Sequence, residues 1–110
     1  VDSSGDYGYF VPHSNGHFAR VSLNDFKSVQ VLNLSLKDES LKGFKRGFSH
    51  GSYGYLVPHY SGDSPSGKAV RVDLNQFSVD SIKILDLDGY DQDLHGFEGG
   101  LSDGTFGYFV

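Results

Sequence analysis

Four aspartates in one short stretch of the chain have the residue type and spacing of a possible cation site. The stretch surrounds Gly89, and closely spaced carboxylates in a turn are the oxygen ligands that calcium prefers. The spacing is not that of an EF-hand, because no glutamate closes the loop. Two interpretations follow, a calcium site and an acidic surface loop, and both concern Asp86, Asp88, Asp91 and Asp93.

A histidine follows a proline at two matching places, His13 and His59, and Tyr60 comes directly after the second. Small-molecule sites commonly combine an aromatic lining with a few polar groups. The pattern therefore suggests a glycan-binding rim made by these three residues. The competing interpretation is that each histidine serves packing or local hydrogen bonding.

Asn33-Leu34-Ser35 is an acceptor sequence for N-linked glycosylation. A glycan at Asn33 would place the protein outside the cell or at the cell surface. Such triplets also arise by chance, so an ordinary asparagine is the alternative. The chain has no cysteine, which excludes disulfides and thiolate metal sites but leaves the compartment open.

The sequence contains no signature of a catalytic centre. The nucleophile elbow Gly-x-Ser-x-Gly, the zinc motif His-Glu-x-x-His and the phosphate-binding loop are all absent. We therefore expect a protein that is not an enzyme and that holds no cofactor, the calcium considered above excepted. A fragment of an enzyme is kept as a third alternative.

The elements that would position these residues occur in two copies. Tyr7–His13 returns as Tyr53–His59, and the motif begins again at Phe106–Val110. A period of roughly 50 residues indicates a propeller, a solenoid or an array. We divide the chain into unit 1, residues 1–52, and unit 2, residues 53–110, which includes the start of a third copy.

The number of residues that separates matching positions of the two units increases along the chain in steps. The separation is 46 residues between Tyr7 and Tyr53 but 53 residues between Ser28 and Ser81. Loops absorb insertions that packed elements do not, so each step marks a loop in unit 2. The two insertions lie within Tyr60–Gly67 and near Val79-Asp80.

Short segments with β-strand character lie between these loops. Ala19–Leu23 and Ala69–Leu74 alternate apolar and polar residues with the period of half-buried strands. His50-Gly51 and Asp103-Gly104 suit tight hairpin turns. The predicted strands are Tyr7–Pro12, Ala19–Leu23, Val29–Leu36 and Gly47–Ser49 in unit 1, and Tyr53–Pro58, Ala69–Leu74, Ile82–Leu87 and Gly99–Ser102 in unit 2, with Phe106–Val110 opening the next copy.

Four antiparallel strands in about 50 residues make one blade of a β-propeller. The order of Tyr53–Val57, Lys68–Leu74, Ile82–Leu87 and the Gly96-Phe97 crossover resembles repeats of NHL, YVTN and PQQ-like propellers, and tandem repeats of large secreted protist proteins. The resemblance implies an all-β fold of two blade-like four-stranded antiparallel units, part of a propeller or repeat array. Those families include scaffolds, binding modules and a few enzymes, whose cofactor residues have no counterpart here. Aromatic residues expected between blades are Tyr9, Phe26, Phe44, Tyr55, Phe77 and Phe97.

Charge and hydropathy limit the partners. The net charge is −5, and residues 56–110 carry nine acidic and three basic side chains. Nucleic-acid binding needs clustered cations, so this balance argues against a nucleic-acid partner. No run approaches the roughly 18 apolar residues of a membrane-spanning helix.

The repeat predicts a structural function. Two blades do not close a ring of four to eight, and repeat units need neighbours to cover their apolar faces. We expect an extracellular module that associates head-to-tail with copies of itself, into a ring or a fibre, by completing neighbouring sheets. The alternative is a carbohydrate-binding propeller of lectin type. The residues expected at the contact are Tyr7, Tyr9, Phe10, Phe106, Tyr108 and Phe109.

Overall fold

The computed structural model describes residues 5–110, and the chain is all-β over that range, which confirms the predicted class. Short 3-10 helices supply the helical content of residues 5–110. The strands are β1 (Tyr7–Phe10), β2 (His17–Ser22), β3 (Val29–Asn33), β4 (Phe44–His50), β5 (Tyr53–Pro58), β6 (Tyr60–Ser61), β7 (Ser64–Pro65), β8 (Lys68–Asp73), β9 (Lys83–Asp86), β10 (Gly100–Ser102) and β11 (Gly107–Phe109). The 3-10 helices are η1 (Leu34–Leu36), η2 (Val79–Ser81) and η3 (Leu87–Gly89).

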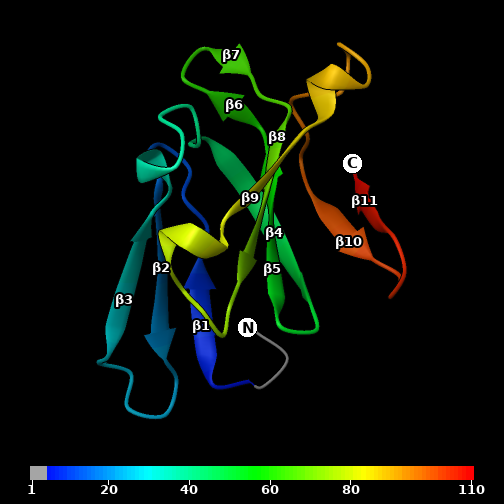
Figure 1. Cartoon of the computed structure of the whole chain (residues 1–110). Helices are drawn as coiled ribbons and strands as arrows, with labels where there is room; N and C mark the ends of the chain where they lie inside the picture. Colours follow the sequence, from blue (N-terminus) through cyan, green and yellow to red (C-terminus); the bar gives the residue numbers. More distant parts are fainter. Residues whose placement is uncertain (1–4) are drawn as a thin grey trace.

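Each sheet is an antiparallel arrangement of strands in chain order. Strands β1, β2 and β3 form a three-stranded sheet, and β4, β5, β8 and β9 form a four-stranded sheet. Strands β10 and β11 make a separate pair, and β6 and β7 make a small hairpin. Figure 1 shows the four-stranded sheet between the three-stranded sheet and the β10–β11 pair.

The hydrophobic core lies between the three-stranded and the four-stranded sheets. One side of β2 faces this core, because Phe18 is buried and its neighbours Ala19 and His17 are less so. Phe44, at the start of β4, is also buried and lies where the chain passes from one sheet to the next. The core comprises Phe18, Leu32, Leu34, Leu41 and Phe44 from unit 1 and Leu56, Val70, Val72, Leu74 and Ile82 from unit 2.

Matching positions of the two units make matching backbone hydrogen bonds. Leu34 N–H donates to the Gly16 carbonyl at 2.7 Å, and Leu87 N–H donates to the Gly67 carbonyl at 2.8 Å. Both bonds fix the point where a strand ends and a 3-10 helix begins. The same correspondence holds for Phe44 to Pro12 and Phe97 to Pro58, and for Leu41 to Asp38 and Leu94 to Asp91.

The two insertions inferred from the sequence coincide with extra structure in unit 2. The first forms the β6–β7 hairpin, and the second forms η2. The boundary at residues 52 and 53 falls between β4 and β5, which pair as a hairpin, so the four-stranded sheet begins within sequence unit 1. The turn of that hairpin is Gly51-Ser52 rather than the expected His50-Gly51, and Gly51 has the positive φ of 59° that such a turn favours.

Two further local expectations are wrong. The strand expected at Val29–Leu36 stops at Asn33, because the Asn33 side chain accepts a hydrogen bond from Ser35 N–H at 3.0 Å and caps η1. Phe26 was expected to pack between sheets, but its side chain is 72% exposed and its φ is +52°. No sheet lies on that side of β1–β3 within residues 5–110, so Phe26 has nothing to pack against.

An ion pair joins the two larger sheets near their edge. Asp38, which follows η1, accepts a hydrogen bond from the Lys68 ammonium at 2.9 Å, and Lys68 also donates to the Ser40 hydroxyl. Hydrogen bonds from Ser40 and then from Lys68 lower the pKa of Asp38 to about 2. The ionised carboxylate therefore contributes to stability in the folded state.

This ion pair makes folding stability depend on pH in the acid range. The folded pKa of Asp38 lies below its unfolded value, so the contribution is complete above the unfolded value near 3.8 and is lost as pH falls toward about 2. Because the pair is partly exposed, we expect Asp38→Asn to cost about 1 kcal/mol near neutral pH. Urea unfolding at neutral and acid pH would measure the gap between wild type and variant. A gap that stays constant down to about pH 2 would contradict this assignment.

Candidate functional site

Arg20 joins the three-stranded sheet to the four-stranded sheet. It extends from β2 between two rings, with its guanidinium carbon 4.2 Å from the Tyr7 ring centre and 4.4 Å from the Phe77 ring centre. Its Nη1 donates to the Leu74 carbonyl at 2.8 Å, and its Nε donates to Gln30 Oε1 at 2.6 Å. The side chain is 8% exposed. Phe77 and Leu74 belong to unit 2, so the arginine bridges the two units.

Arg71 occupies the matching position of the four-stranded sheet and has one of these four contacts. Its guanidinium lies over the Tyr53 ring at 4.3 Å, as Arg20 lies over Tyr7. Within residues 5–110 no second ring and no backbone carbonyl complete the arrangement. The side chain is half-buried. Arg71 therefore faces an open surface with one side of its guanidinium uncovered.

That surface is an apolar groove of about 440 Å³ beside β11. Phe48 and Tyr55 stack at 5.1 Å and form its floor next to Arg71, and Phe109 of β11 approaches Phe48 at 6.2 Å. Leu85 of β9 is exposed at the opposite side. We call this surface the C-terminal face, formed by Phe48, Tyr55, Arg71, Leu85 and Phe109.

A second apolar surface covers the outer side of the three-stranded sheet. Phe10 pairs with Ala19, and Val31 pairs with the same Ala19 across the other edge of β2, so these side chains share one side of the sheet. Tyr9 and Phe18 point to the other side, into the core. We call the outer surface the N-terminal face, formed by Phe10, Leu23, Phe26, Val29 and Val31, all of them exposed.

Each position of the N-terminal face has a matching position in unit 2 that packs inside the molecule. Phe10 is 62% exposed, whereas its counterpart Leu56 is 2% exposed. Val29 is 61% exposed, whereas its counterpart Ile82 is 2% exposed. The remaining pairs are Leu23 with Leu74, Val31 with Ile84, and Phe26 with Phe77, and every unit 2 member packs in or against the core.

The residues expected at the contact between molecules divide into two sets. Tyr7 and Tyr9 are engaged inside the molecule, with Tyr9 5.7 Å from Phe18. Phe10, Phe106 and Tyr108 are exposed, and Phe109 is half-buried against Phe48 and Phe97. The sequence reasoning did not assign a role to Arg20 and Arg71, although their matched positions in the repeat were the signal.

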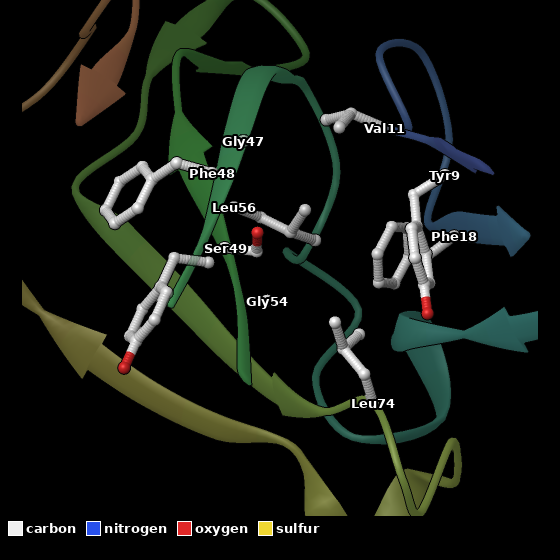
Figure 2. Close-up of a pocket in the computed structure, with 10 residues that line it drawn as sticks. Tyr9, Val11, Phe18, Gly47, Phe48, Ser49, Gly54, Leu56 and Leu74 are labelled. Carbon is white, nitrogen blue, oxygen red and sulfur yellow. The ribbon is translucent and has the colours of Figure 1, made fainter. Parts of the chain in front are cut away.

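A small cavity of about 110 Å³ lies where the two larger sheets meet. Figure 2 shows Leu56, Leu74 and Tyr9 around it, with Phe48 on the other side of β4 and β5. Its lining is mainly apolar and contains no carboxylate, histidine or lysine. The cavity is below the usual size of a ligand site, so we regard it as a packing gap of the core.

The proposed ligand rim is partly assembled. His13 and Tyr60 line one cavity of about 260 Å³ together with Lys42 and Asp63. His59 contacts the edge of the Tyr60 ring at 4.8 Å, but its Nδ1 lies 2.9 Å from the Phe97 carbonyl and faces away from that cavity. Two of the three predicted residues therefore share a concave site, and the third supports it.

Two of the four aspartates act as local caps, and the four do not gather into one site. Asp86 caps η3 by accepting from Asp88 N–H at 3.2 Å, and Asp91 accepts from Asp93 N–H at 2.9 Å. Across residues 5–110 no three histidine, aspartate or glutamate side chains lie close enough to hold a metal ion. Asn33, the glycosylation candidate, takes the same capping position in unit 1. Calcium binding and glycosylation stay predictions.

No family model, no curated protein and no solved structure matches this chain. In the part of the chain that the structure describes, no helix is long and apolar enough to cross a membrane. The two open apolar faces are therefore the features of the chain that bear most directly on its function.

Proposed function

We propose that this protein is a structural repeat module that associates head-to-tail with copies of itself outside the cell. One observation carries the proposal: positions buried between the sheets in unit 2 are exposed in unit 1. The N-terminal face of one molecule matches the surface that packs on the three-stranded sheet. The C-terminal face matches the surface that receives it. The three-stranded and four-stranded sheets already pack on each other once within the molecule. The N-terminal and C-terminal faces are the two surfaces that would repeat this packing between molecules.

The sheets are, in this proposal, blades of a propeller-like array. The four-stranded sheet is a complete blade, the three-stranded sheet lacks its first strand, and β10–β11 supplies the first two strands of another. The missing first strand of one molecule corresponds to β10 of its neighbour. Docking would therefore complete a sheet across two chains through main-chain hydrogen bonds between neighbouring strands.

Strand β11 must separate from β10 before β1 of a neighbouring molecule can pair with β10, because β11 and β1 hold the same place in the repeat. The β10–β11 pair is short, and Phe106 and Tyr108 on it are exposed. A two-stranded hairpin by itself is marginally stable, but Phe109 of this one also packs on Phe48 and Phe97, so the arriving β1 must replace those contacts with its own. The arriving sheet also buries five apolar side chains, each contributing roughly 1.5–3 kcal/mol against the entropy cost of association.

Removing apolar side chains from the N-terminal face is expected to abolish self-association. Sedimentation velocity over a concentration series should show larger species for the wild type and a single small species for Phe10→Ser/Val29→Ser. The matched control is Leu36→Ser, which removes an equally exposed apolar side chain from η1, outside the N-terminal face. Equal association of all three proteins, or a monomeric wild type throughout, would overturn the proposal.

A second candidate function is carbohydrate binding at the His13–Tyr60 cavity. The observation in its favour is that Tyr60, His13 and Asp63 line one concavity, which combines a ring with polar groups. A monomer that is retained on immobilised glycans, and is released when Tyr60 is replaced by alanine, would favour this function over assembly.

A further inference from the structure

Arg71 lies at the C-terminal face with the Tyr53 ring against its guanidinium. We propose that the uncovered side of its guanidinium receives Phe26 from the N-terminal face of a second molecule, and that the Leu23 carbonyl of that molecule accepts its hydrogen bond. This inference rests on the proposed function and names the residues that determine register. The occupant is therefore a second copy of this chain.

The template for this contact is the arrangement at Arg20. There the guanidinium lies between Tyr7 of its own sheet and Phe77 of the next, and it donates to the Leu74 carbonyl. Arg71 has the first ring already, since Tyr53 matches Tyr7. The missing ring is therefore the residue that matches Phe77, and the missing carbonyl is the one that matches Leu74.

Phe26 and Leu23 hold those matching positions in unit 1. Phe26 follows β2 as Phe77 follows β8, and both are separated by two residues from the leucine that supplies the carbonyl. Phe26 is presented to solvent on a turn, where its N–H donates to the Ser22 carbonyl at 2.8 Å. A large exposed ring held in place by the backbone is suited to insertion against a planar cation.

The residue paired with Arg71 differs in kind from the residue paired with Arg20. Lys83 pairs with Arg71 across β8 and β9 where Gln30 pairs with Arg20, so the Gln30 side chain that accepts from Arg20 Nε has no counterpart. Arg71 thus lacks the polar partner that fixes Arg20 from its own sheet. Phe26 and a carbonyl of the second molecule would satisfy it.

The test measures the association constant of the full chain by sedimentation equilibrium for wild type, Arg71→Lys, Phe26→Leu and the double variant. Arg71→Lys keeps the charge but loses the planar group that stacks and donates. We expect each single change to weaken association about tenfold, and the double variant to be no weaker than either single one. Lys37→Gln, a change at an exposed lysine outside both faces, is the control for an unrelated surface substitution. Circular dichroism and thermal unfolding confirm that each variant is folded.

The outcomes separate this inference from the proposed function. A wild type that associates while both single variants stay within about twofold of it would overturn the Arg71–Phe26 contact and leave assembly in place. Single losses that add in full in the double variant would also overturn it, because the two side chains would then act independently. A wild type that stays monomeric at every concentration would overturn both.

Discussion

Replacement of Gly43 by alanine is expected to destabilise the fold by about 3–5 kcal/mol. Gly43 has a φ of +74°, and a Cβ atom built there would overlap the backbone carbonyl of Tyr60. The Gly43 carbonyl also accepts N–H bonds from His59 and Tyr60, at 3.1 and 2.9 Å, so the two segments are held together and do not move apart. Thermal unfolding of the full chain would measure the loss.

The control for this change is the same substitution at the matching position, Gly96. Its φ is +67°, so alanine there is strained to a similar degree, but the nearest atom to an added Cβ is 3.5 Å away in Pro65. We expect Gly96→Ala to cost about 1 kcal/mol, the strain of the left-handed backbone without the overlap. Equal losses for the two variants would show that backbone conformation, and not the close approach of Tyr60, requires glycine at residue 43.

Arg20→Met is expected to cost about 2–4 kcal/mol of folding stability. The change removes a cation between two rings and leaves the Leu74 carbonyl without its donor in a buried setting. Methionine retains most of the apolar stem, so the loss reports chiefly on the guanidinium contacts. Urea unfolding followed by circular dichroism would give the free energy.

Arg71→Met supplies the matched comparison within the same molecule. Because Arg71 has one ring contact and no carbonyl partner among residues 5–110, we expect a loss below about 1 kcal/mol when the protein is dilute. A loss of folding stability at Arg71 as large as that at Arg20 would contradict the conclusion that Arg71 has fewer partners within the molecule than Arg20. The comparison measures folding stability, so it stands apart from any association of molecules.

Local sequence signals predicted the strands well. Alternation and turn residues located β2, β8, β9 and the β4–β5 hairpin, because those signals arise from side-chain direction and backbone conformation within a few residues. They placed the end of β3 too late, since the Asn33 side chain competes with the strand for the Ser35 N–H. A hydrogen bond of that kind is hard to distinguish from strand alternation by pattern alone.

The candidate site was less predictable, because its contacts join residues far apart in the chain. The repeat placed Arg20 and Arg71 at matching positions, yet the stacking of Arg20 on Phe77 depends on two sheets meeting. The exposure of Phe26 likewise follows from which sheet has a neighbour and not from the residues around it. Matched positions with unequal burial were the informative comparison, and burial is known only from the structure.

The β6–β7 hairpin gives the molecule a practical entry point for chemistry. Gly62 and Asp63 form its exposed tip, Gly62 has a φ of +68° with open space around it, and residues 5–52 of unit 1 contain no equivalent hairpin. Exposed loop tips tolerate inserted segments, so a peptide tag or a cysteine for a fluorophore can be introduced there without disturbing either open face. Because one unit carries the hairpin and the other does not, each chain would bear a single label at a known end of its sheet pair.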